Sequence, residues 1–249
     1  MSETKTKKDK TNDNSTFQFK QFSLKQDKCT MKIGTDGVLL GAWADVENAK
    51  TALDIGTGTG IIAIMLAQRT EKTIVHAVEI ESAACNQARE NMEGTPWSDR
   101  LEAFNTSIQE HAKSHPHQYD LIISNPPFFT GGTFSNNQDK NSVRHTVKLP
   151  HGDLLSAVRT LLSENGRFAT ILPYIEGLRF QELAKTYNLY LTKVLEVKPR
   201  KDKSVERLLM QFEREEKPLE KEELVIQHDG ANAWTDEYVA LTGDFYLHM

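Results

Sequence analysis

A run of three glycines between a short apolar strand and an apolar helix is the feature that most constrains the fold of this chain. Residues 51–55 are predicted to form the strand, Gly56-Thr57-Gly58-Thr59-Gly60 the turn, and residues 61–69 the helix. Glycine adopts positive φ without strain and lets a ligand approach the backbone, while the amino end of a helix offers unpaired N–H groups. Strand, glycine-rich turn and helix in this order therefore predict a nucleotide-binding α/β fold.

The spacing of the glycines favours a nucleoside that carries no pyrophosphate. The dinucleotide fingerprint G-x-G-x-x-G needs a small sixth residue, but Ile61 stands there and would crowd a pyrophosphate at the helix start. Glu79 lies near the end of the next predicted strand, residues 73–80, about twenty residues past the glycines, where a carboxylate can accept hydrogen bonds from two ribose hydroxyls. The candidate cofactor-binding residues are Asp54, Gly56, Gly58, Gly60 and Glu79.

A second motif, Asn125-Pro126-Pro127-Phe128, follows the apolar stretch 119–124, which is predicted to be a buried strand. The two prolines end this strand, because neither can donate a ladder hydrogen bond. The Asn125 amide oxygen, the Pro126 carbonyl and the Phe128 ring could together hold a planar group that bears an exocyclic amine. Taken alone, such a motif is more often a simple proline turn, and its combination with the glycine turn favours the functional interpretation.

Strands and helices alternate along the rest of the chain, which predicts an α/β fold with a doubly wound, mostly parallel sheet. The turn 198–203 is too short to cross over between the strands predicted at 189–197 and 205–212, so the last strand is expected to be antiparallel. A short edge strand is predicted at 224–226. A hairpin is predicted within residues 22–33, Asp36 is expected to cap a helix at 38–43, and Gly166 is expected to close a helix at 154–162.

The composition predicts how the chain divides into domains and where in the cell it is located. Residues 1–16 contain almost no apolar side chain and are expected to form a disordered tail, which leaves residues 17–249 as a single domain with an amino-terminal hairpin. The sequence has no apolar run long enough for a membrane span and no secretory signal. Cys29 and Cys85 lack CxxC spacing, so we expect no metal site, no disulfide and a cytoplasmic location.

Charge is distributed unevenly along the chain. The formal net charge of -5 argues against a nonspecific nucleic-acid binder, yet basic side chains gather between residues 198 and 207. A basic loop on an acidic body is compatible with a structured polyanion as the partner, and about equally with a solvated loop. The candidate side chains in the predicted turn are Lys198, Arg200, Lys201 and Lys203.

The glycine turn, the acid after the second strand and the antiparallel last strand together resemble the Rossmann-like class I S-adenosylmethionine-dependent methyltransferases. Asn-Pro-Pro-Phe resembles the motif of their amino-methyltransferase branch, which acts on adenine N6 or cytosine N4 in DNA, guanine N2 in rRNA, or glutamine in release factors. The stretch 32–43, Phe129, the Arg144-His145 pair and the closing stretch 244–247 are similar to the bacterial tRNA(Val) adenine-N6 methyltransferase family. The similarity extends over essentially the whole chain after the tail.

This resemblance implies S-adenosylmethionine as the cofactor and, as the substrate, the N6 amine of the adenine next to the anticodon of a tRNA. It implies a catalytic role for Asn125, Pro126, Pro127 and Phe128. Separately, we expect a monomer that uses neither metal nor membrane. Further residues implied to bind the cofactor are Thr35, Asp36, Ser107, Ile108 and Asn125, and those implied to contact RNA are Phe129, Arg144 and His145.

Other acceptors and other classes of protein stay open at this point. Guanine N2 in rRNA, adenine in DNA and glutamine in protein are the alternative acceptors within the branch. A nucleotide-binding regulator without catalysis is disfavoured by Asn125 and Phe128, and a nicotinamide dehydrogenase is disfavoured by Ile61 and the two prolines. Many relatives carry an acid where Asn105-Thr106-Ser107 stands, so contact with the cofactor adenine is expected through Ser107 and the Ile108 backbone.

Overall fold

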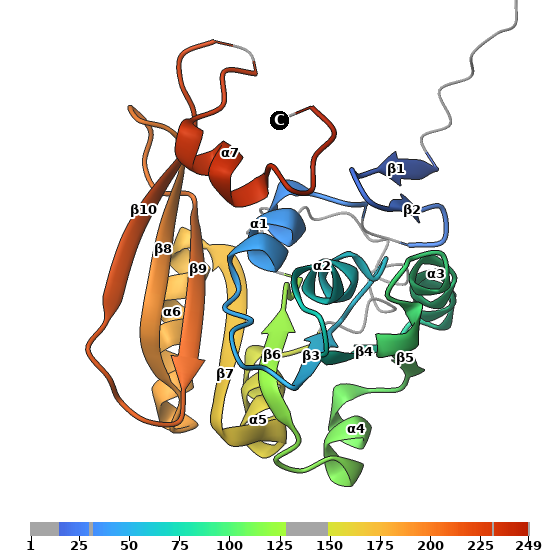
Figure 1. The fold of residues 1–249 in the computed structure, drawn as a ribbon. Coiled ribbons are helices and arrows are strands. Elements are labelled where there is room, and N and C mark those ends of the chain that lie inside the picture. Colours follow the sequence, from blue (N-terminus) through green and yellow to red (C-terminus); the bar gives the residue numbers. More distant parts are fainter. Residues whose placement is uncertain (1–14, 30–31, 128–148, 231, 249) are drawn as a thin grey trace, which may run out of the picture.

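The computed structural model describes residues 15–29, 32–127, 149–230 and 232–248. Its centre is an eight-stranded sheet of order β10-β8-β9-β7-β6-β3-β4-β5, with helices on both faces (Figure 1). The strands of this sheet are β3 (Thr51–Ile55), β4 (Ile74–Glu79), β5 (Leu101–Asn105), β6 (Tyr119–Ser124), β7 (Leu162–Pro173), β8 (Tyr190–Arg200), β9 (Arg207–Glu213) and β10 (Glu220–Gln227).

Two apolar cores lie on the two faces of the sheet. Successive strand residues point to opposite faces, so on β3 Ala52 joins one core and Leu53 the other. The first core takes apolar residues from α1 (Thr35–Trp43), α2 (Ile61–Arg69), α3 (Ser82–Glu93) and α7 (Asp236–Thr242). The second takes them from α4 (Ile108–Ser114), α5 (His151–Leu161) and α6 (Tyr174–Thr186). The predicted doubly wound α/β architecture is therefore confirmed (Figure 1).

The strand directions confirm the predicted antiparallel pair near the end of the chain, and a further parallel strand follows that pair. Strand β9 is antiparallel to both of its neighbours, β7 and β8, and the other paired strands of the sheet are parallel. The edge strand predicted at 224–226 is longer, because β10 spans Glu220–Gln227 and pairs in parallel with β8. The antiparallel strand thus lies inside the sheet, and the last strand of the chain is parallel.

The predicted hairpin at 22–33 was placed too late in the sequence. The observed hairpin joins β1 (Thr16–Gln18) to β2 (Ser23–Lys25), so Thr16, the last residue of the predicted tail, already lies in a strand. Aromatic anchoring explains the shift, since Phe19 is fully buried and stacks on Phe22 at a centroid distance of 4.7 Å. Phe19 also bridges to Tyr246, which attaches the hairpin to the carboxyl-terminal segment.

Two local predictions failed around α5 and α4. Gly166 does not close a helix, because α5 ends at Leu161 and Gly166 lies within β7. A glycine is needed there for packing, since a Cβ would lie 2.8 Å from Leu162 Cδ1.

Helix α4 was not predicted at all. It follows Ser107, whose hydroxyl accepts a hydrogen bond from the Glu110 N–H at 3.2 Å and caps the helix.

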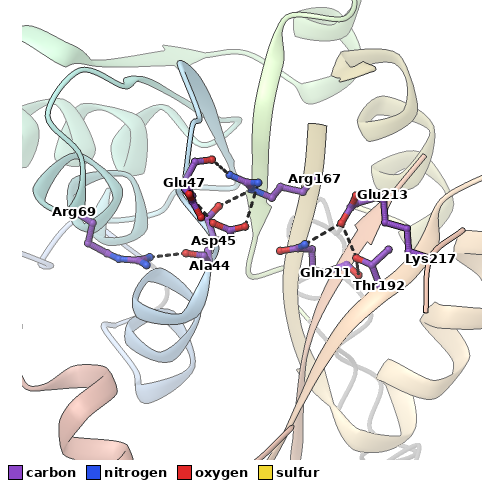
Figure 2. Close-up of polar contacts among 9 residues, drawn as sticks. All are labelled: Ala44, Asp45, Glu47, Arg69, Arg167, Thr192, Gln211, Glu213 and Lys217. Atoms are coloured by element: carbon purple, nitrogen blue, oxygen red, sulfur yellow. Dashed lines mark hydrogen bonds and ion pairs between the residues drawn. The ribbon is translucent and has the colours of Figure 1, made fainter. Parts of the chain in front are cut away.

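Two arginines fix the segment between α1 and β3 (Figure 2). Arg69, the last residue of α2, donates to the carbonyls of Gly41 and Ala44 at 2.8 and 2.7 Å. Arg167 on β7 donates to the Asp45 carbonyl at 2.8 Å and pairs with its carboxylate at 3.1 Å. These contacts hold α1 against the sheet. Within the described part of the chain, no helix is both long and apolar enough to cross a membrane.

Candidate active site

The glycine turn and the Asn125 motif leave adjacent strands at one edge of the sheet. Ile55 of β3 and Ser124 of β6 are Cα partners, and the Ser124 hydroxyl donates to the Ile55 carbonyl at 3.0 Å. Gly56 and Asn125 follow these two residues, so they start from strands about 4.8 Å apart. The order of strands reverses between β3 and β6, and ligands of open α/β sheets bind at such a switch point.

The glycine turn has the conformation that only glycine adopts readily. Gly56, Gly58 and Gly60 have φ angles of 71°, 55° and 84°, and Gly60 is the N-cap of α2. A Cβ at Gly56 or Gly58 would meet nothing within 4 Å, so backbone conformation rather than packing demands glycine there. The open space beside both residues fits a ligand that approaches the backbone closely.

Glu79, at the end of the neighbouring strand β4, holds the glycine turn in place by hydrogen bonding. Its carboxylate accepts the Gly58 N–H through Oε2 and the Glu81 N–H through Oε1, both at 3.0 Å. The side chain is buried at 9% exposure. An ionised carboxylate has about four acceptor positions, so these two bonds leave capacity for ribose hydroxyls. The predicted ribose-binding residue therefore also shapes the turn.

Asp54 lies beneath the same turn and is only 1% exposed. Its Oδ2 accepts the Thr57 hydroxyl at 2.6 Å. Burial raises the pKa of Asp54 to about 7, although the Thr57 hydroxyl and the Ala63 amide oppose this shift. Asp54 thus supports the turn from inside the protein, and its side chain does not face the open space.

Asn91 of α3 was not singled out from the sequence, yet it joins the glycine turn to the amino-terminal segment. Its Nδ2 donates to the carbonyls of Thr59 and Lys25 at 2.8 and 2.9 Å, and its Oδ1 accepts the Lys25 N–H at 2.9 Å. Nearby, Gln87 accepts the Lys28 N–H at 3.1 Å. A buried amide inside a polar helix has no periodic signal, so only the structure could reveal this role.

Helix α1 brings Thr35 and Asp36 to the same edge of the sheet. A Cβ at Gly37 would lie 3.7 Å from Ile61 Cγ2, which shows that α1 packs on the start of α2. The prediction that Asp36 caps α1 is wrong: the N-cap is Gly34, which has no side chain to form the cap. Asp36 instead accepts a hydrogen bond from Arg207 Nε of β9 at 2.9 Å, and the ion pair connects α1 to the far half of the sheet.

The end of β5 carries Asn105, which ties together three neighbouring segments. Its Nδ2 donates to the carbonyls of Glu79 and Ile80 at 2.9 and 3.1 Å, and its Oδ1 accepts the Ser82 hydroxyl at 2.7 Å. Asn105 therefore ties β5 to the end of β4. Ser107 uses its hydroxyl to cap α4, and Ile108 is buried as the first residue of that helix.

The structure covers only part of the second motif. Asn125 is half-buried, Pro126 is buried and Pro127 is exposed. Phe128, Phe129, Arg144 and His145 lie outside the described residues.

The segment predicted to be a basic turn, residues 198–203, belongs partly to a strand. Strand β8 continues through Arg200, so Lys198 and Arg200 belong to it. Lys198 pairs with Glu223 of β10 at 2.7 Å, and Lys203 lies 3.7 Å from its neighbour Asp202. Arg200, Lys201 and Lys203 are exposed.

The family match, together with the fold and the switch-point geometry, places this chain among the methyltransferases. Residues 31–168 match the family model described as the methyltransferase small domain. Among solved structures, a predicted O-methyltransferase from Agrobacterium tumefaciens is similar in fold, with a TM-score of 0.68 at 17% identity over 84% of this chain and 96% of that chain. The cofactor of this class is S-adenosylmethionine, and the open space at Gly56 and Gly58 and the braced carboxylate of Glu79 fit it.

Curated relatives narrow the class to one family. The tRNA1(Val) (adenine(37)-N6)-methyltransferase of Flavobacterium johnsoniae is 46% identical over 94% of this chain and 100% of its own length. The protein of the same name from Trichodesmium erythraeum is 45% identical over 93% of this chain and 97% of its own length. The chain belongs to the tRNA1(Val) (adenine(37)-N6)-methyltransferase family.

Proposed function

We propose that this protein transfers the methyl group of S-adenosylmethionine to the N6 amine of an adenine in tRNA, at the position next to the anticodon. The observation that carries the proposal is the placement of the glycine turn and Asn125 on neighbouring strands, joined by the Ser124–Ile55 hydrogen bond of 3.0 Å. The names of the relatives support the choice of adenine and of tRNA. Because tRNA is the substrate, we also propose a cytoplasmic location, and a monomer as the active form.

The acceptor amine needs help from the protein, because its lone pair is conjugated with the adenine ring. The Asn125 side-chain oxygen and the Pro126 carbonyl accept hydrogen bonds from its two protons and favour a tetrahedral nitrogen. Its lone pair then points toward the glycine turn. When bound, S-adenosylmethionine would supply the methyl group of its positively charged sulfonium, whose sulfur–methyl bond breaks to leave a neutral thioether. After transfer, the amine loses its excess proton to water, and the rate comes mainly from positioning and directed dipoles.

The remaining residues divide between the two ligands. On the cofactor side, the backbone of the glycine turn contacts the cofactor and Glu79 accepts the ribose hydroxyls, while Asp54 supports the turn. Thr35, Asp36, Ser107 and Ile108 complete that side of the site. On the RNA side, Phe128 stacks on the target base, a contact worth roughly 1–3 kcal/mol. The further RNA contacts are assigned to Phe129, Arg144, His145, Arg200, Lys201 and Lys203. Lys198 is the least available of the candidate RNA-binding cations, because it is paired with Glu223.

Methyl-labelled cofactor tests the acceptor directly. The protein is incubated separately with total tRNA, total rRNA, DNA and protein, and the products are hydrolysed and analysed for methylated nucleosides and amino acids. Label in N6-methyladenosine from tRNA is expected. Label that appears only in guanine, in DNA or in glutamine would refute the proposed acceptor.

Asn125→Ala tests the role of the amide. We expect kcat to fall by a factor of about 100 or more, because loss of one directed polar group from a reaction centre costs that much. The affinity for S-adenosylmethionine, measured by calorimetry, should stay within a few-fold. Asn86→Ala is the matched control, since Asn86 is an exposed residue of α3. A hundredfold loss of cofactor affinity in Asn125→Ala would instead show that Asn125 mainly binds the cofactor.

A further inference from the structure

The turn between β8 and β9 opens on the same edge of the sheet as the glycine turn and Asn125. Strand β9 is antiparallel to both β7 and β8, so β8 runs parallel to β7 and ends at the same edge as β6. Strands β6 and β8 are three positions apart in the order β8-β9-β7-β6. The pairing places Val194 level with Ser124, so β8 extends six residues past the end of β6. At about 4.8 Å between strands and about 3.3 Å per residue, the end of β8 lies roughly 25 Å from the end of β6.

Ion pairs decide which cations of this region are available to a ligand. Lys198 is paired with Glu223 at 2.7 Å, and Arg207 with Asp36 at 2.9 Å. Lys203 lies 3.7 Å from Asp202. Arg200 and Lys201 are exposed, and no carboxylate of the described residues lies within ion-pair distance of either. These two side chains therefore carry the uncompensated positive charge of the turn.

The first turn of α6 lies beside the basic turn. The Tyr174 N–H donates to the Glu206 carbonyl at 3.0 Å, which attaches the start of α6 to the segment that leads into β9. Gly177 allows close packing, since a Cβ there would lie 2.9 Å from Leu208 Cδ1 of β9. The amino-terminal end of α6 and the β8–β9 turn are thus parts of one continuous surface.

The outer side of α6 is apolar only at this end. Ile175 is 53% exposed and Leu178 is 41% exposed, and the exposed Arg179 follows them. Spacings of three and four residues place these side chains on one side of the helix. Further along, Glu182 and Lys185 form an ion pair at 3.1 Å, as expected for a solvated helix surface. Ile175 and Leu178 together form a small exposed apolar patch rimmed by the exposed Arg179, and an apolar patch with a polar rim is the arrangement found at contact surfaces.

We propose that Ile175, Leu178, Arg179, Arg200 and Lys201 form a docking surface for the tRNA substrate, on the side of the molecule where the glycine turn and Asn125 lie. The three cations contact phosphates of the anticodon loop, and the two aliphatic side chains pack against a nucleoside of the same loop. Nucleic acid fits both features, since it presents regularly spaced negative charge together with apolar base and sugar surfaces. The identity of the RNA rests on the proposed function.

Two double variants and two matched controls test this surface. Arg200→Ala with Lys201→Ala removes the two free cations, and Ile175→Ser with Leu178→Ser removes the apolar pair. The controls are Lys50→Ala with Lys72→Ala, and Ile74→Ser with Leu219→Ser. These four residues are also exposed, and they lie at the opposite end of the strands, where β3, β4 and β10 begin.

Binding of an unmodified tRNA transcript is measured by fluorescence anisotropy over a series of salt concentrations. The cation variant should bind about tenfold more weakly, and its slope of log Kd against log salt should fall by about 1.4, because each lost single-strand phosphate contact removes about 0.7. The apolar variant should bind about fivefold more weakly with its slope unchanged. Both controls should stay within twofold of the wild type, and calorimetry with S-adenosylmethionine should show unchanged cofactor binding in all four variants.

Equal tRNA affinity in the cation variant and its control would overturn the docking surface. So would a change in molecular mass by light scattering in the apolar variant with no change in RNA affinity, because the surface would then join copies of this chain. These outcomes are distinct from failure of the proposed function, because that failure would mean that the wild-type protein itself forms no N6-methyladenosine in tRNA.

Discussion

Asp54→Asn is expected to make the protein more stable at alkaline pH and to change little in acid. The carboxyl is buried beneath the glycine turn, and burial raises its pKa to about 7 from an ordinary value of 3.8. Below about pH 4 the folded and unfolded states are both protonated. Between about pH 4 and 7 only the unfolded state is ionised, so wild-type stability falls as pH rises. Above about pH 7 both are ionised and the penalty is constant.

The size of the effect follows from the shift in pKa. A difference of about three units at roughly 1.4 kcal/mol per unit corresponds to about 4 kcal/mol between acid and alkaline pH. Asparagine carries no charge to bury, and its amide can still exchange a hydrogen bond with the Thr57 hydroxyl, which Asp54 accepts at 2.6 Å. The stability gained over the wild type should therefore grow with pH up to about 7 and then level off.

Urea unfolding followed by circular dichroism at pH 4.5, 6 and 8 measures this gain. Asp99→Asn is the control, because Asp99 is an exposed carboxyl and its substitution should show no such trend. A difference between Asp54→Asn and the wild type that is equal at pH 4.5 and pH 8 would refute the reasoning. It would mean that the Asp54 carboxyl is ionised in the folded protein throughout this range.

Two further predictions concern the cofactor site and the buried polar network behind it. Glu79→Ala should weaken S-adenosylmethionine binding at least about tenfold in calorimetry, because it removes the ribose acceptor and the brace on the Gly58 N–H; unchanged affinity would exclude Glu79 from the site. Tyr119→Phe should lower the free energy of unfolding by about 2–4 kcal/mol in urea titrations, since its hydroxyl meets His76 Nδ1 at 2.7 Å and His111 Nε2 at 2.8 Å. Burial lowers the pKa of both imidazoles, that of His111 to about 4, so the loss should persist from pH 6 to 8; a loss below about 0.5 kcal/mol would show that water replaces the hydroxyl.

Features with a short-range signal were predictable from the sequence. The strand 51–55 and the helix 61–69 are found at the predicted residues, because the apolar period and the glycines between them act locally. The antiparallel direction of β9 followed from the length of one turn. The proximity of the glycine turn to Asn125 followed in outline from the parallel sheet, since the carboxyl ends of parallel strands share an edge.

Features that depend on distant residues were not predictable. Asp36 precedes an apolar stretch as a helix cap does, but its charge is matched by Arg207 from the other half of the sheet. Helix α4 has only two buried apolar residues, Ile108 and Ala112, so its sequence has no clear apolar period. Its third buried residue, His111, forms a hydrogen bond with the Tyr119 hydroxyl, which comes from another element. The hairpin was misplaced because its anchor is Phe19, whose partner Tyr246 comes from the other end of the described chain.

The attachment of the hairpin to the carboxyl-terminal segment has a consequence for the order of folding. The Lys20 N–H donates to the Phe245 carbonyl at 2.8 Å, and the Lys20 side chain donates to the Gly243 carbonyl across 223 residues of sequence. Contacts of such separation form late, because a long loop must close before they contribute. During synthesis, a chain that has already assembled its glycine turn still lacks Tyr246, the carboxyl-terminal partner of Phe19. The side of the Phe19 ring that Tyr246 covers in the folded protein is then open to solvent, and exposed apolar surface of this kind favours aggregation of a nascent chain.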